Sequence, residues 1–241
     1  MLRINRHINA NTDFSAGVVL LINKPIKWSS FDVVKKIRGI LKFYTSHKKI
    51  KVGHAGTLDP LATGLLIICT GKYTKKISEI QNEEKTYTGE ITLGGTTPSF
   101  DKETKVNKKY KTDHIHDDMI HFKCHDFIGE TLQYPPVFSA LKINGKRLYK
   151  YARNGECAKI NPRPITISSF EITKIIMPKL EFKVSCGKGT YIRSLANDYA
   201  RSLNTGGYIS KLQRTKIGNY SLKDALSIND FEKLILKPNI T

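Results

Sequence analysis

Gly53-His54-Ala55-Gly56-Thr57-Leu58-Asp59-Pro60-Leu61-Ala62-Thr63-Gly64 is the most informative stretch of this 241-residue chain. Three glycines and one proline in twelve residues exclude the interior of a helix and predict a fixed loop. The loop leads directly into the apolar run 65–69, which is typical of a buried strand.

Asp59 has unusual electrostatic surroundings. It is the only carboxylate between residues 33 and 78, a window that also holds ten lysines and arginines. A carboxylate would repel phosphate if this region merely bound a polyanion, which suggests a chemical role for it. The structural alternative is an Asp-Pro turn in which Asp59 caps its own backbone. Loop chemistry alone leaves both interpretations open.

The charge of the whole chain indicates its partner. Forty lysines and arginines against 21 acids give a net charge of +19 and a pI of about 9.7, which favours a nucleic-acid partner. The alternative is an AT-rich coding sequence that inflates the lysine count. Four widely spaced cysteines favour reduced thiols. No apolar run is long enough to span a bilayer, and the N-terminus lacks the apolar segment of a secretory signal. We therefore expect a cytoplasmic protein.

Hydrophobic periodicity predicts most of the helices and strands. Strands are expected at 17–22, 65–69, 86–93, 166–172, 180–186 and 208–217, and helices from Ser29 or Ser30 to 41, at 72–80, from 117 to about 128, at 190–203 and from about 228. Residues 1–16 are polar and irregular, so a flexible N-terminus is predicted. No repeat, linker or change of composition marks a domain boundary.

One segment combines positive charge with aromatic rings. Residues 131–155, the basic segment, contain no acid. Its cations are Lys142, Lys146, Arg147, Lys150 and Arg153. A helix after Gly145 would place Lys146, Lys150 and Arg153 on one stripe, with tyrosines between them. This mixture binds phosphates and stacks on bases, so contact with RNA or DNA is predicted; a solvated helix face is the alternative.

Residues 114–125 hold four histidines and one cysteine. His121 and His125 have the i,i+4 spacing of a zinc-binding helix. No glutamate lies between them and no set of four ligands is evident, which favours an ordinary solvated helix over a metal site.

The glycine-rich loop resembles the catalytic motif of the TruB family of bacterial tRNA pseudouridine synthases. Further stretches resemble the family in the same order and extend the likeness to about residues 17–230: Asn23-Lys24-Pro25, Lys85-Thr86-Tyr87, residues 134–153, Arg163-Pro164-Ile165-Thr166 and residues 188–195. Ala55 departs from the family pattern, which often has threonine there. The chain also ends where many relatives continue into an RNA-binding PUA domain.

The resemblance implies an α+β pseudouridine synthase fold, a mixed and largely antiparallel sheet flanked by helices with a central catalytic cleft. One catalytic domain would span residues 17–241, the basic segment included, without a PUA domain. The implied reaction isomerises the uridine at position 55 in the T-loop of tRNA. The N1–C1′ bond breaks, the base turns, and C5 joins C1′. Such an isomerisation requires neither a cofactor nor a metal.

The resemblance also implies roles for individual residues. Asp59 is the essential carboxylate, acting either as a nucleophile at C1′ or as a base at C2′. Arg193 pairs with Asp59 and keeps it ionised. Tyr87 stacks on the flipped uracil, Tyr191 lines the pocket, and His54 holds the T-loop open.

The implied partner is the T-arm of tRNA, contacted by a set of cations. These are Lys24, Lys142, Lys146, Arg147, Lys150 and Arg153. No membrane and no obligate protein partner are expected, and the protein is expected to be a monomer. Two other classes compete with the enzyme: a non-catalytic RNA-binding protein on the same scaffold, and a DNA-binding structural protein. The presence of Asp59, Tyr87 and Arg193 favours the enzyme.

Overall fold

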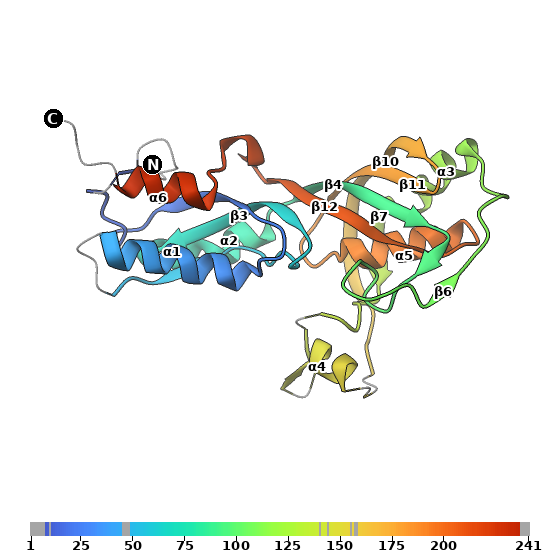
Figure 1. Ribbon diagram of the computed structural model, residues 1–241, viewed down its shortest axis with the longest axis horizontal. Coiled ribbons are helices and arrows are strands. Elements are labelled where there is room, and N and C mark those ends of the chain that lie inside the picture. The colour runs from blue at the N-terminus through green and yellow to red at the C-terminus, as the bar shows by residue number, and fades with distance from the viewer. Residues whose placement is uncertain are drawn as a thin grey trace. The chain divides into compact units, whose positions relative to one another are not determined.

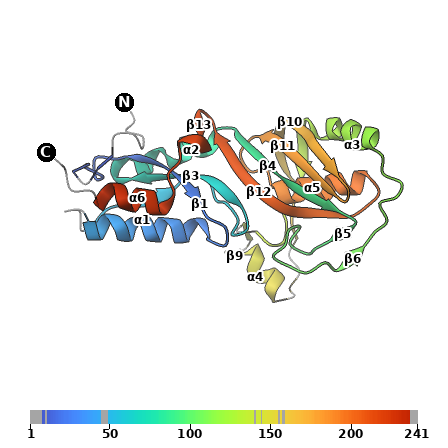
Figure 2. The same cartoon turned by 45° about the horizontal axis from the view of Figure 1, so that its top comes forward.

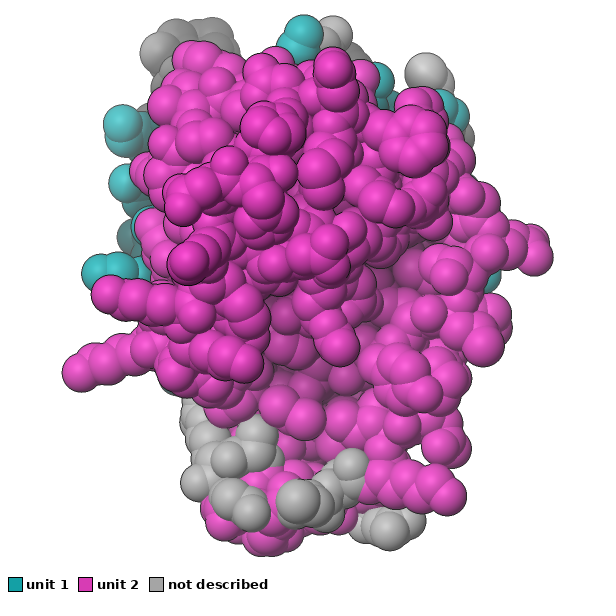
Figure 3. Space-filling view, turned by 90° about the vertical axis from the view of Figure 1, so that its right-hand side faces the viewer, with its two compact units in different colours: residues 1–86, 213–241 teal, residues 87–212 magenta. Residues whose placement is uncertain are grey.

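The computed structural model describes residues 8–9, 11–44, 49–139, 141–143, 145–154, 156 and 159–236. The chain forms two compact units, residues 1–86 with 213–241 and residues 87–212 (Figures 1 and 3). The passage from one unit to the other occurs inside two strands, β4 (Lys85–Leu93) and β12 (Gly207–Ile217). The sequence therefore carries no linker at either crossing point.

The first unit is built on β3 (Thr63–Thr70), the strand that follows the glycine-rich loop. β1 (Val19–Lys24) pairs with it antiparallel, from Val19 opposite Cys69 to Lys24 opposite Gly64. β2 (Val52–His54) pairs antiparallel with the end of β3, and β12 pairs parallel with its start. The short β13 (Tyr220–Ser221) extends β12 as a hairpin. The glycine-rich loop is thus the connection between two paired strands, β2 and β3.

Helices cover both faces of this sheet. α1 (Ser30–Tyr44) and α6 (Ile228–Leu236) pack against each other on one face, as Figure 2 shows. The short 3-10 helix η2 (Gly71–Lys76) and α2 (Ile77–Asn82) contribute to the core on the other face. Alternate residues of β1 and β3 enter the two core clusters, so these strands are buried on both sides.

The predicted start of α1 is confirmed by a reciprocal cap. The backbone N–H of Asp32 donates to Ser29 Oγ at 3.1 Å, and the backbone N–H of Ser29 donates to Asp32 Oδ2 at 2.8 Å. This is a capping box with aspartate in place of glutamate, and it satisfies two N–H groups that a helix start leaves without partners.

Residues 1–7 and 10 of the predicted loose terminus lie outside the described residues, and within the rest the prediction is wrong for two apolar side chains. Ile8 and Phe14 are buried in the core cluster of α1 and α6. The Phe14 ring meets Phe231 edge-on, with ring centroids 6.5 Å apart. Burial of one such aromatic ring contributes about 2–3 kcal/mol, which is enough to hold an otherwise polar segment in place.

In the second unit the large sheet continues in the order β12–β4–β11–β10–β7, and the short strands β5 (Gly95–Thr96) and β6 (Lys108–Lys109) form a separate antiparallel pair. β10 (Arg163–Ile176) and β11 (Lys179–Cys186) form an antiparallel hairpin, and β7 (Gly129–Gln133) pairs antiparallel with the start of β10. α5 (Ile192–Ser202) and α3 (Asp117–Cys124) complete its core, where Tyr199 meets Phe170 edge-on at 5.1 Å.

The basic segment differs from its prediction. Instead of one helix after Gly145, the two-residue strands β8 (Lys142–Ile143) and β9 (Lys146–Arg147) form a hairpin, and α4 (Leu148–Arg153) begins only after it. Gly145 has a φ of +78°, which suits the turn of the hairpin. The single helical stripe is therefore wrong for Lys146, which lies on a strand.

Candidate active site

The glycine-rich loop is held by hydrogen bonds near its start and in its middle. The backbone N–H of Ala55 donates to Ile67 O at 2.9 Å. In the middle of the loop, the buried Ser30 hydroxyl accepts from Leu58 N at 2.8 Å and is 3.1 Å from Leu58 O, to which it donates. The N–H of Ala62 then donates to Asp59 O at 3.1 Å, which closes a turn. Asp59 is half-buried on a backbone that is held on either side of it.

Arg214 on β12 supports the same loop from within the unit. Its side chain is 1 % exposed, and Nε donates to Leu65 O at 2.9 Å while Nη2 donates to Gly56 O at 3.0 Å. Nη1 reaches Thr57 O at 3.5 Å. The sequence gives no sign of this role of Arg214, because an arginine in an alternating strand is normally expected to face solvent.

Lys24 lies beneath the loop, fully buried at the end of β1. Its Nζ donates to the backbone oxygens of Pro25 at 3.0 Å, Trp28 at 2.5 Å and Pro60 at 3.3 Å. Burial lowers the pKa of Lys24 to about 8, with Asp59 acting to raise it and Arg214 acting to lower it. This burial argues against the predicted contact of Lys24 with RNA. Its contact with Pro60 makes it a support for the Asp59 turn.

We expect Lys24→Met to lower the free energy of unfolding by about 2 kcal/mol at pH 7, because methionine leaves three carbonyl groups without their donor. The pKa of Lys24 is lower in the folded protein than the usual 10.5, so the unfolded chain binds more protons between about pH 8 and 10.5. As the pH rises through that window, the free energy of unfolding of the parent protein therefore increases relative to that of the variant. Urea unfolding at pH 7 and pH 10 measures both effects.

Lys35→Met, at an exposed position on α1, is the matched control and is expected to change stability by less than about 0.5 kcal/mol. Equal losses in the two variants, or a gap that shrinks at pH 10, would contradict the buried role of Lys24.

His54 is the last residue of β2 and the second residue of the glycine-rich loop. Burial lowers the pKa of His54 below its usual value, the Arg214 charge lowers it further, and a backbone hydrogen bond at Gly56 opposes both. The lowered pKa favours the neutral form of the imidazole. Its Nδ1 is buried and has no hydrogen-bond partner within the described residues.

The other predicted site residues belong to the second unit. Tyr87 on β4 is 9 % exposed, and the half-buried Tyr191 is the residue before α5. Arg193 is 4 % exposed: Nη1 donates to Ser99 O at 2.8 Å and Nη2 to Phe138 O at 2.9 Å. The carboxylate of Asp101 lies 3.7 Å from its Nε. No sequence motif marks Asp101 as a residue of this site. The pairing of Arg193 with Asp59 would join the two units and stays a prediction.

The cations of the basic segment differ in their exposure and in their ion pairs. Lys142, Arg147 and Lys150 are exposed. The Nζ of Lys146 instead lies 2.6 Å from Glu156 Oε2 and 4.5 Å from the centroid of the Tyr151 ring. Glu156 lies one residue beyond the acid-free segment, so the composition gave no sign of this ion pair. The side chain of Arg153, also predicted to bind RNA, lies outside the described residues.

The four histidines of residues 114–125 are exposed, as expected for a solvated helix face, and only Cys124 of this group is buried. His114 Nε2 is 3.0 Å from Leu203 O, and burial raises the pKa of the Cys124 thiol. In the part of the chain that the structure describes, no three His, Cys, Asp or Glu side chains lie together as metal ligands. Nor is any helix within that part long and apolar enough to cross a membrane.

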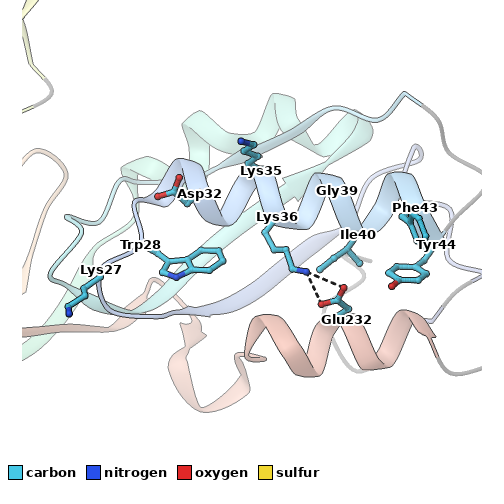
Figure 4. Close-up of a pocket in the computed structure, with 10 residues that line it drawn as sticks. All are labelled: Lys27, Trp28, Asp32, Lys35, Lys36, Gly39, Ile40, Phe43, Tyr44 and Glu232. Carbon is cyan, nitrogen blue, oxygen red and sulfur yellow. Dashed lines mark hydrogen bonds and ion pairs between the residues drawn. The ribbon is translucent and has the colours of Figure 1, made fainter.

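A hollow of about 710 Å³ opens beside α1 and α6 in the first unit (Figure 4). Lys36 and Glu232 pair across it at 2.9 Å. Its described lining is Lys27, Trp28, Asp32, Lys35, Lys36, Gly39, Ile40, Phe43, Tyr44 and Glu232. None of these is a predicted site residue, so the hollow is separate from the glycine-rich loop.

Comparison with known proteins finds a matching family and similar proteins in other organisms. The model of a family described as "TruB family pseudouridylate synthase (N terminal domain)" matches residues 42–192. A protein of Flavobacterium johnsoniae named tRNA pseudouridine synthase B is 52% identical over 222 residues, which cover 92% of this chain and 97% of that protein. The protein of the same name in Phocaeicola vulgatus is 47% identical over 219 residues, or 91% of this chain and 93% of that protein.

Two solved structures share the fold. A chain in the crystal structure of a Cbf5-Nop10-Gar1 complex gives a TM-score of 0.68 at 24% identity, covering 96% of this chain and 62% of that chain. A chain in an H/ACA RNP bound to a substrate RNA containing 2′-deoxyuridine gives 0.65 at 24% identity, covering 89% and 52%. This chain therefore spans between half and two thirds of those chains. The predicted α+β fold is confirmed.

Proposed function

The chain belongs to the TruB family of pseudouridylate synthases, and on this premise we propose that it isomerises uridine 55 in the T-loop of tRNA to pseudouridine. The observation that carries the proposal is Asp59, a carboxylate on a loop that Ser30, Lys24 and Arg214 hold in one conformation. A turn residue would need less support, because an Asp-Pro turn forms from local hydrogen bonds alone.

The reaction conserves every atom of the uridine. The N1–C1′ bond breaks and its electron pair stays on N1 of the uracil. The base then turns, C5 bonds to C1′, a base removes the C5 proton, and N1 gains a proton. Asp59 acts on the sugar, either by attacking C1′, from which C5 then displaces it, or by removing a proton from C2′, which it returns to C2′ when C5 bonds to C1′. A fixed carboxylate serves both routes, because the bound sugar meets it without further ordering of the loop.

The pocket residues have complementary roles in this proposal. A duplex or a folded loop hides the uridine, so the base must be flipped out before Asp59 can reach its sugar. The neutral His54 ring takes the place of the flipped base, and its lowered pKa supports this role because no charge has to be buried in the stacked loop. Tyr87 stacks on the uracil, Tyr191 lines its pocket, and Arg193 pairs with Asp59.

The basic segment binds the phosphates of the T-arm through its exposed cations. Arg147→Ala and Lys150→Ala are each expected to weaken tRNA binding and to reduce the slope of log affinity against log salt by up to about one unit. Lys146→Ala is expected to have less effect, because Glu156 already neutralises it. Binding titrations from about 50 to about 200 mM salt measure these slopes.

Glu156→Gln is the matched control for this prediction. It releases the Lys146 ammonium without adding a cation and is expected to strengthen tRNA binding and steepen the salt dependence. Unchanged slopes in the Arg147 and Lys150 variants would return these residues to an ordinary solvated surface.

The proposed substrate also bears on the location and the partners of the protein. A tRNA-modifying enzyme works in the cytoplasm, and the proposed chemistry needs no membrane and no obligate protein partner. We expect a monomer, which sedimentation at micromolar concentration tests. The competing function is a non-catalytic RNA-binding protein, which would bind tRNA equally well and leave every uridine unchanged.

A further inference from the structure

The side chain of Gln133 makes a two-point contact with the backbone of Tyr191. The N–H of Tyr191 donates to Gln133 Oε1 at 2.8 Å, and Gln133 Nε2 donates to Tyr191 O at 3.1 Å. A backbone N–H can only donate and a carbonyl can only accept, so this pair of contacts fixes the orientation of the amide. Gln133 is 5 % exposed, which shields both hydrogen bonds from water.

The turn that precedes Tyr191 is held by two hydrogen bonds: the N–H of Gly187 donates to Thr166 O at 2.9 Å, and the Thr190 hydroxyl donates to Gly187 O at 3.1 Å. Tyr191 itself has an extended backbone, φ −95° and ψ 107°, and no side chain caps α5 at this point. The preceding residues form a turn in which Gly189 has a φ of +90° and open space where a Cβ would be. On the C-terminal side Leu195 N donates to Tyr191 O at 3.0 Å. Gln133 therefore supplies the second fixed point that sets the rotation of the Tyr191 peptide.

Gln133 is itself well placed to act as this anchor. It ends β7, where it lies opposite Arg163 of β10 in an antiparallel register. The residues that follow it are also bound to the start of α5, since Ser194 Oγ donates to Tyr134 O at 2.8 Å and Arg193 donates to Phe138 O at 2.9 Å. The rigid end of a sheet strand is thus connected to the first turn of α5 at three places.

From this geometry we propose that Gln133 is a positioning residue that sets the orientation of the Tyr191 ring toward the uracil. The inference rests on the proposed function, in which Tyr191 lines the base pocket. Only glutamine combines a donor and an acceptor at this reach. Asparagine is one methylene shorter, glutamate lacks the donor, and methionine matches the length but has neither strong donor nor acceptor.

The test is a double-mutant cycle of Gln133→Met and Tyr191→Ala, read as the single-turnover rate of pseudouridine formation at saturating tRNA. Gln133→Met is expected to slow this step about 10- to 100-fold, because small displacements of a positioned group cost rates of that order. It is expected to leave the tRNA dissociation constant within about twofold. In the Tyr191→Ala background it is expected to cause no further loss, because there is no ring left to orient.

Ser202→Ala is the control, since it removes a side-chain hydrogen bond, 2.8 Å to Tyr199 O, from the far end of the same helix. It is expected to keep the parent rate. If Gln133→Met keeps the parent rate, or if its loss is the same with and without the Tyr191 ring, the inference is overturned and Gln133 is only structural. A parent protein that forms no pseudouridine would instead overturn the proposed function. The cycle thus distinguishes a failure of the proposed function from a failure of the positioning role of Gln133.

Discussion

Asp59→Asn is expected to bind tRNA and to form no detectable pseudouridine. Asparagine keeps the size of the side chain and can keep a turn hydrogen bond, but it has neither the charge nor the nucleophilic oxygen of the carboxylate. Removal of a reacting group costs about a thousandfold or more in turnover, whereas affinity for tRNA depends on the basic surface and on the base pocket. Single-turnover assays beside a binding titration and a thermal melt measure the three properties separately.

If Asp59 only shaped a turn, the same substitution would cost about 1 kcal/mol of stability or less and would leave activity largely intact. Turnover by Asp59→Asn above a few per cent of the parent rate would therefore exclude Asp59 as the reacting group. Asp101→Asn provides a comparison, because it changes the buried carboxylate that lies 3.7 Å from Arg193 rather than the one on the loop.

Gly64→Ala is expected to destabilise the first unit by about 3 kcal/mol or more. Gly64 ends the glycine-rich loop with a φ of +102°, which is strained for any residue with a side chain. A Cβ at this position would lie 2.3 Å from Arg214 O and 2.8 Å from Arg214 N, where only a shift of the β3–β12 pairing could relieve the contact. Urea unfolding measures the loss of stability. We expect the same substitution to lower the rate of pseudouridine formation, because Gly64 ends the loop that carries Asp59.

Gly39→Ala is the matched control for this glycine. Gly39 lies inside α1, where a Cβ would meet no atom within 4 Å outside its own helix backbone, and alanine is expected to raise stability by about 0.5–1 kcal/mol. A small effect at Gly64, comparable in size to that at Gly39, would show that the end of the loop is not held against β12.

The sequence predicted the elements that have a strong local signal. β3, β11 and β12 lie where an apolar run or an alternating pattern places them, and α1 is capped by Ser29, one of the two predicted caps. The α+β fold came from the family resemblance, because periodicity identifies strands but does not pair them. No change of composition marks the boundary between the two units, since it falls inside β4 and β12.

The errors share a physical cause, which is that side-chain partners distant in sequence are not encoded in local composition. The family resemblance implies that Lys24 contacts RNA, yet three backbone carbonyls hold its Nζ inside the fold. Lys146 was assigned to a helical stripe, but it lies on a strand and pairs with Glu156. Arg214 and Gln133 were missed because their function is to bind the backbone of other elements.

The most direct test of the account is to incubate the protein with unmodified tRNA and to map pseudouridine at single-nucleotide resolution, with Asp59→Asn in parallel. The account predicts that uridine 55 of the T-loop is converted by the parent protein and remains uridine with Asp59→Asn, although both proteins bind the tRNA. A parent protein that binds tRNA and converts no uridine would contradict the account and establish a non-catalytic RNA-binding protein in its place.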